Sequence, residues 1–104
     1  MLTKRQLEIL DMLCKSEDRE IVCDGRHCMI DLENISRKSV YALLGHMAIK
    51  DAGYASAGCD IYKPSLEAEK IVRRPALADE MVARVIMRKP FYVDDDGNIQ
   101  DSKA

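Results

Sequence analysis

The stretch IDLENISRKSVYALLGHMAIKDAGY, residues 30–54, decides the predicted fold of this chain. Ser36 opens a helix in which apolar residues recur at helical spacing. They are Val40, Leu43, Leu44 and Met47. We expect this helix to end near Asp51, where Gly53 can supply a left-handed cap. Residues 31–35, just before Ser36, leave room for one further helical turn.

Two elements are expected before this stretch. Residues 3–16 predict a helix, because Thr3 can act as N-cap and Gln6 has the capping-box position. Residues 20–30 predict a β-hairpin, because Asp24-Gly25 is a favoured type I′ turn between two apolar runs. One face of this hairpin would hold Ile21, Cys23, Arg26, Cys28 and Ile30, and the other Val22, His27 and Met29.

The residues after the long helix predict a two-stranded wing and two helices. Residues 54–63 suit two short strands that turn at Ala57-Gly58, and Pro64 stops the second strand. Ser65 is expected to cap the next helix. Pro75 would interrupt that helix and open another over residues 75–89. Asp96-Gly97 then suggests a tight turn within residues 90–104.

This order of elements is that of a winged helix, and residues 30–54 resemble the helix-turn-helix core of bacterial and phage winged-helix proteins. The shared features are an Ile-Ser turn, a Ser-Arg-x-Ser-Val-Tyr helix start, and a closing Lys-Asp-x-Gly-Tyr. The segment IYKPSLEAEKIV resembles the segment after the wing in those families. The resemblance spans about residues 3–74. It implies an α+β, mostly helical winged helix-turn-helix, with a short hairpin, a two-stranded wing and a C-terminal helix. Residues 1–90 would form one domain and residues 91–104 a C-terminal hairpin or tail.

Composition narrows the class of function. The 104 residues carry a formal net charge of −2, whereas nucleic-acid binders are usually basic, at least in patches. No apolar run approaches the length of a membrane span, and the chain enters a helical pattern without a signal peptide. We therefore expect a cytoplasmic protein without membrane contact, in which all four cysteines are reduced.

Three kinds of reactive or metal site are weighed against simpler interpretations. Cys23, His27 and Cys28, with Cys59, contain zinc-ligand types, but their spacing is unusual and buried apolar cysteines explain them better. A Cys-His pair without a marked base and pocket does not indicate catalysis. Asp94, Asp96 and Asn98 lack the glycine position and the glutamate of a calcium loop. The sequence thus predicts no enzyme, no metal and no cofactor.

The resemblance implies a DNA-binding transcriptional regulator that contacts double-stranded DNA. Arg37 and Lys38 would anchor phosphates, and Tyr41 and His46 would face the groove. Lys50 and Lys63 complete the candidate contacts. The alternative interpretation of these six residues is a solvated surface, since few groups that read bases lie on the helix.

A second hypothesis is a protein-binding winged helix, such as a phage-encoded inhibitor of a bacterial defence system of the anti-CRISPR type. Ala42, Gly45 and Ile49 would form a small strip that lets a protein target approach closely. The acidic cluster Asp94, Asp95 and Asp96 would mimic phosphate charge.

A third hypothesis is a dimerising structural module. The helix over residues 75–89 has a broad apolar arc, which indicates either a homodimer or deeper burial within the domain. The arc consists of Leu77, Met81, Val82, Val85 and Ile86.

Overall fold

The computed structural model describes residues 1–54 and 58–101 and has an α+β fold. Its helices are α1 (Lys4–Lys15), α2 (Arg37–Gly45), α3 (Ala68–Arg73) and α4 (Ala76–Ile86). Its strands are β1 (Ile21–Cys23), β2 (Cys28–Ile30), β3 (Glu33–Ile35), β4 (Ile49–Tyr54), β5 (Asp60–Pro64), β6 (Tyr92–Val93) and β7 (Ile99–Gln100). These helices hold 12, 9, 6 and 11 residues, so the expectation of a mostly helical chain is wrong.

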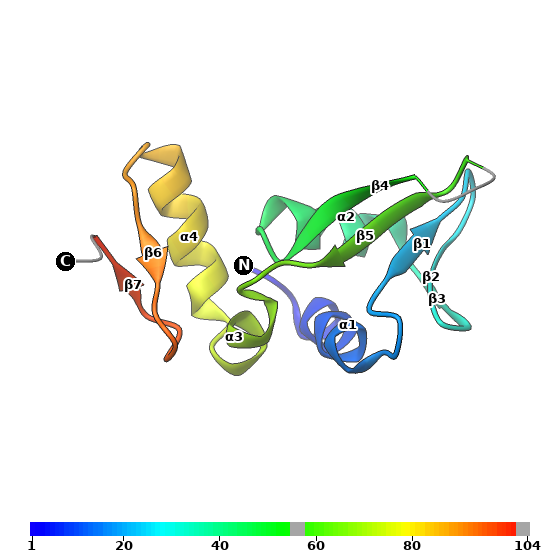
Figure 1. The fold of residues 1–104 in the computed structure, drawn as a ribbon, viewed down its shortest axis with the longest axis horizontal. Helices are drawn as coiled ribbons and strands as arrows, with labels where there is room; N and C mark the ends of the chain where they lie inside the picture. The colour runs from blue at the N-terminus through cyan, green and yellow to red at the C-terminus, as the bar shows by residue number, and fades with distance from the viewer. Residues whose placement is uncertain (55–57, 102–104) are drawn as a thin grey trace.

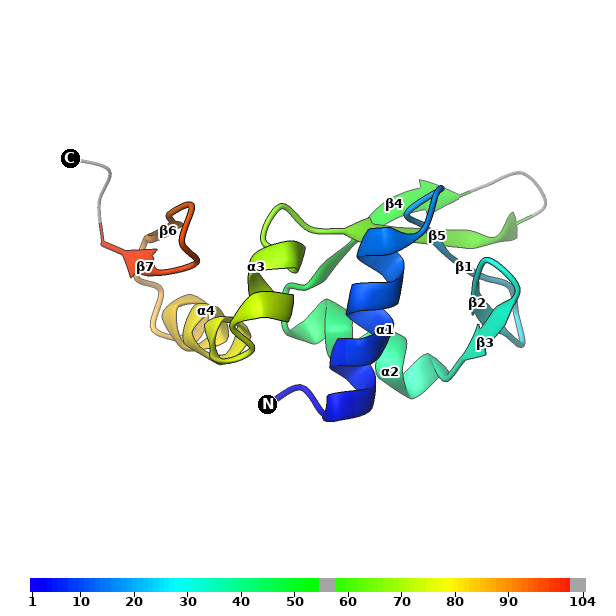
Figure 2. The same cartoon turned by 90° about the horizontal axis from the view of Figure 1, so that it is seen from below.

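The main sheet is antiparallel, with strand order β3-β2-β1-β5-β4. Helices α1 and α2 lie on one side of it, and α3 leads to α4 at the other end of the molecule, where the β6–β7 hairpin is found (Figures 1 and 2). The molecule is elongated, with extents of 45 × 23 × 22 Å.

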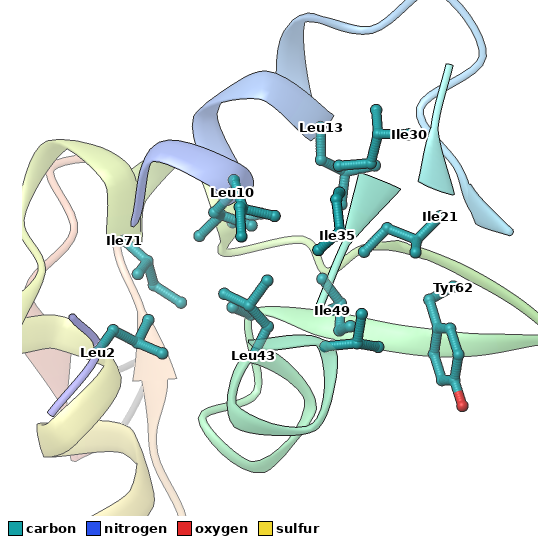
Figure 3. Packing of buried hydrophobic residues seen from close by; sticks show 14 of the residues in the cluster. Leu2, Leu10, Leu13, Ile21, Ile30, Ile35, Leu43, Ile49, Tyr62 and Ile71 are labelled. Carbon is teal, nitrogen blue, oxygen red and sulfur yellow. The ribbon is translucent and has the colours of Figure 1, made fainter. Parts of the chain in front are cut away.

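The hydrophobic core lies between the helices and the inner face of this sheet. In Figure 3, Leu10 and Leu13 of α1 and Leu43 of α2 point toward side chains of the strands and toward Ile71 of α3. The capping box predicted for α1 is present, because the Thr3 hydroxyl accepts from the Gln6 N–H at 3.1 Å and the Gln6 side chain accepts from the Thr3 N–H at 2.9 Å.

The β1–β2 hairpin has the predicted faces but a different turn. Cys23 pairs with Cys28 and Val22 with Met29, so the turn is centred on Gly25-Arg26. Gly25 has no positive φ, which a type I′ turn requires. The cause is the Asp24 carboxylate, which accepts the N–H groups of Arg26 and His27 at 2.7 and 2.6 Å. The pairing differs from the prediction by two residues, so the same strand residues stay inside, but Arg26 is an exposed turn residue.

The helical turn predicted at residues 31–35 is wrong, because these residues form a turn and strand β3. Asp31 has a φ of 53°, and Ile30 pairs with Glu33 across a two-residue turn. Ile35 is buried while Leu32 is 91% exposed. A β2–β3 hairpin therefore occupies the segment for which the sequence predicts a helical turn.

Helix α2 also ends six residues earlier than predicted. Met47 takes the left-handed cap position with a φ of 61°, and its N–H bonds the Leu44 carbonyl at 3.1 Å. The Ala48 N–H bonds the Leu43 carbonyl at 2.9 Å, which completes a Schellman motif. Residues 49–54 consequently form strand β4. Gly53, expected as the helix cap, instead has a φ of 98° at a β-bulge in this strand.

The segments after the wing keep the predicted order. Pro64 ends β5 and Pro75 directly precedes α4, whereas Ala57 of the predicted wing turn lies outside the described residues. Ser65 does not cap α3, and Glu67 holds the cap position. The Ser65 hydroxyl is buried and has no hydrogen-bond partner among the described residues. The turn predicted at Asp96-Gly97 is present, with a φ of 83° at the glycine.

Candidate functional site

Helix α2 has one face that points away from the core, and this face carries both polar and apolar residues. Val40 and Leu43 are fully buried, and the opposite face consists of Arg37, Lys38, Tyr41, Leu44 and Gly45. We call these five residues the α2 surface. Their spacing of three and four residues places them on one side of the helix. The Ser36 hydroxyl starts the helix by accepting the Ser39 N–H at 3.1 Å.

The α2 surface is held in place by Arg37. Its Nη2 donates to the backbone carbonyl of Asp24 at 2.8 Å, and its Nη1 lies 3.5 Å from the Tyr41 hydroxyl. The backbone N–H groups of His27 and Arg26 lower the pKa of Asp24, so the carboxylate that shapes this turn stays charged. The first cation of the surface thus has a defined position although it is only partly buried.

Carboxylates lie beside this surface. Burial raises the pKa of the Tyr62 hydroxyl, and the charges of Asp60 and Asp51 raise it further. Asp51 is the cross-strand partner of Tyr62, and Asp60 lies two residues before Tyr62, so both carboxylates share the face of the hairpin that carries Tyr62. The side of the β4–β5 hairpin next to α2 is therefore acidic.

The six residues predicted to contact DNA do not converge. Arg37, Lys38 and Tyr41 belong to the α2 surface, and Tyr41 is 55% exposed. Lys50 and Lys63 are cross-strand partners, and the Lys63 ammonium lies 4.0 Å from Glu20 on the opposite side of the sheet.

The sixth residue, His46, is directed toward another element. Its Nδ1 lies 2.9 Å from the Ala42 carbonyl, and its Nε2 lies 3.6 Å from the Asp79 carboxylate of α4. The ring is half-buried there, so it does not project from the α2 surface.

The strip proposed for a protein target is only partly exposed. Gly45 is exposed and Ala42 is half-buried, but Ile49 is 3% exposed in strand β4, so its place on an outward helical strip is wrong. Leu44 was predicted to point inward and is 37% exposed.

The acidic cluster lies in the β6–β7 turn, at the far end of the molecule from the main sheet (Figure 1). The Asp94 carboxylate accepts the N–H groups of Asp96 and Asn98 at 3.0 and 2.9 Å and the Gln100 side-chain N–H at 3.0 Å. Asp94 thus shapes the turn, whereas Asp95 and Asp96 are exposed.

The cysteines differ from the expectation of four reduced thiols. Cys23 and Cys28 are joined by a disulfide across β1 and β2, and both are buried in the core. Cys14 and Cys59 are free thiols. His27 is exposed in the turn, so the candidate zinc ligands are not brought together. Among residues 1–54 and 58–101, no three His, Cys, Asp or Glu side chains gather as metal ligands.

Two further findings bear on the class of protein. Within the described part of the chain, every helix is too short or too polar to cross a membrane. Comparison of the chain with protein-family models, curated proteins and solved structures found no match.

Proposed function

We propose that this chain is a protein-binding module that contacts its partner through the α2 surface. The observation that carries the proposal is the composition of that surface. An ordered arginine and an exposed tyrosine lie beside Leu44 and Gly45, and tyrosine and arginine are the residue types that dominate binding energy at protein interfaces. Gly45 has no side chain there, which lets a partner backbone approach.

The distribution of charge favours a protein over a nucleic acid as the partner. Of the candidate DNA contacts, only Arg37, Lys38 and Tyr41 share one face. Asp51 and Asp60 lie on the face of the β4–β5 hairpin that carries Tyr62, and their charge would repel phosphates. The net charge of −2 would also disfavour binding to phosphates.

We further propose that the fold is a variant of the winged helix. In favour of this, α2 leads directly into the β4–β5 hairpin, and β1 pairs with β5 as the third strand of the wing sheet. The β2–β3 hairpin would replace the first helix of the helix-turn-helix. An inhibitor of a bacterial defence system would suit such a module, and this narrower assignment stays a prediction.

The test of protein binding is Gly45→Arg. A Cβ at Gly45 meets no atom within 4 Å, so the arginine fits without disturbing the helix and blocks a close partner. Ala83→Arg adds the same charge at an exposed position of α4 and serves as the matched control. Proteins captured from extracts of the source cells would be purified and their affinities measured. Gly45→Arg should weaken binding by about 30-fold or more, and Ala83→Arg should leave it unchanged.

DNA binding is the second candidate, because α2 has no acidic residue and has Arg37 and Lys38 in its first turn. Binding would then fall with salt at a log-log slope of about −0.9 per phosphate contact. The double variant Arg37→Ala/Lys38→Ala should reduce that slope by about two contacts. Under this candidate Gly45→Arg strengthens DNA retention. That result, without any protein complex sensitive to Gly45→Arg, would replace the first proposal by the second.

A further inference from the structure

The side of the main sheet opposite α1 and α2 is not covered by any described helix (Figures 1 and 2). Strand residues alternate between faces, so Val22 and Met29 point to this side while their neighbours Ile21 and Cys28 are buried on the other. Val22 pairs with Met29 on one strand and with Ile61 on the other. An apolar row therefore crosses three strands on this face, in which Val22 and Met29 are accessible and Ile61 is buried. We call this side the outer sheet face.

The outer sheet face contains a depression. A depression of about 300 Å³ has Val22 and Met29 among its lining residues. The same depression is lined by the four carboxylates of Asp18, Glu20, Asp24 and Asp31. Apolar side chains between acidic ones, in a depression on an exposed sheet, are typical of a binding surface more than of a plain solvated face.

The charge of this rim is largely uncompensated within the described residues. Among the described residues, Lys63, 4.0 Å from Glu20, is the one lysine or arginine that forms an ion pair with a lining residue, and His27 also lines the depression. Asp24 has a lowered pKa, and Asp31 accepts a hydrogen bond from the Ser16 hydroxyl at 3.1 Å. A partner that supplies cations around an apolar residue matches both the negative charge of the rim and the apolar side chains in the depression.

We infer that the outer sheet face binds an extended segment of a partner protein in which every second residue faces the sheet, and in which these facing residues are in turn lysine or arginine and small apolar. An extended segment places alternate side chains on opposite sides, with neighbours of one side about 7 Å apart. Such a segment reaches Asp18 and Glu20 with its cations while its apolar residues cover Val22 and Met29. The surface is separate from the α2 surface, which lies on the other side of the sheet.

The test uses the fluorescently labelled nonapeptide Lys-Ser-Val-Ser-Lys-Ser-Val-Ser-Lys, acetylated and amidated at its ends, in which Lys and Val share one face (the Lys-Val peptide). Its counterpart has Glu in place of each Lys (the Glu-Val peptide). Anisotropy titrations against the full chain would be made at about 50 mM salt, where surface charges are weakly screened. The Lys-Val peptide should bind and the Glu-Val peptide should not. The double variant Asp18→Asn/Glu20→Gln should weaken binding by about fivefold, as expected for the loss of two exposed charge pairs.

Two controls separate this surface from general attraction to an acidic protein. Asp95→Asn/Asp96→Asn removes the same charge in the β6–β7 turn, at the other end of the molecule, and should leave the affinity unchanged. Val22→Asn keeps all charges and should weaken binding by about threefold through lost apolar contact. Equal weakening by both acidic double variants, an unaffected Val22→Asn, or no binding of the Lys-Val peptide would overturn the inference. Gly45→Arg should not change this affinity, so the outcome is independent of the α2 proposal.

Discussion

The guanidinium of Arg37 donates a hydrogen bond to the backbone carbonyl of Asp24 at 2.8 Å. This contact joins the start of α2 to the turn between β1 and β2, 13 residues earlier in the chain. The Asp24 carboxylate holds the same turn through its own backbone bonds. The position of the first α2 cation therefore depends on the conformation of a hairpin that lies outside the helix.

The carboxylates of Asp24 and Asp94 should make the protein sensitive to acid. Backbone hydrogen bonds from His27 and from Asn98 lower their pKa values in the folded chain below 3.8. A lowered pKa contributes stability above the unfolded pKa, and this contribution is lost as the pH falls through the folded value. The urea midpoint should thus decrease below about pH 4. Asp94→Asn should flatten this decrease, and Asp95→Asn, whose carboxylate accepts no hydrogen bond within the described residues, should not.

Leu43 and Leu44 should respond oppositely to a charged substitution. Leu43 is 0% exposed, so Leu43→Asp buries an unpaired charge and should cost about 4 kcal/mol or more, enough to unfold the domain. Leu44 is 37% exposed, so Leu44→Asp should cost about 1 kcal/mol or less. Thermal melts followed by circular dichroism measure both. Similar melting of the two variants would contradict the end of α2 at Gly45.

The disulfide between Cys23 and Cys28 should stabilise the folded chain. It closes a loop of six residues, for which the reduced freedom of the unfolded chain is worth about 2 kcal/mol. A reductant should therefore lower the urea midpoint of the parent protein, and Cys23→Ala/Cys28→Ala should show no response to it. Intact mass under non-reducing conditions gives the direct check. A parent mass that matches four free thiols would refute the cross-link.

The homodimer predicted from the apolar arc of α4 can involve only part of that arc. Leu77 and Met81 are buried within the domain, whereas Val85, Ile86 and Met87 are 52%, 75% and 58% exposed. If the chain dimerises through α4, Ile86→Glu should reduce the mass measured by light scattering from twice the chain mass to one. Leu66→Glu changes an exposed apolar residue outside α4, 88% exposed, and should leave the mass unchanged. A monomeric parent would contradict the prediction.

The sequence predicts the elements whose signals are local. The capping box of α1, the two proline boundaries and the turn at Gly97 each depend on a few neighbouring residues, and each is present. The end of α2 is missed because the left-handed cap is Met47, where sequence rules look for glycine. Strand β3 is missed because three residues are too few to show an alternating pattern.

The candidate site is harder to predict than the fold, since it depends on which residues become neighbours. The sequence identifies Arg37, Lys38, Tyr41 and Gly45 from the helix start and spacing alone. It places Ile49 outward because it continues the helical period past the observed end. It also groups Lys50 with α2 and adds Lys63 near the wing to the same DNA contacts, whereas strand alternation directs both to the other side of the sheet. Only the pairing of β4 with β5 reveals that division.

The bulge between Asp51 and Gly53 makes the β4 edge of the main sheet a poor template for a further strand. Strand β4 is the longest strand and lies at an edge of the main sheet, where a regular row of free N–H and C=O groups would invite further strands. The bulge interrupts that row, and the Asp51 carboxylate takes up the Gly53 N–H at 2.8 Å. Growth of the sheet from one molecule to the next is thereby disfavoured along this edge, which leaves the broad faces of the domain available for recognition.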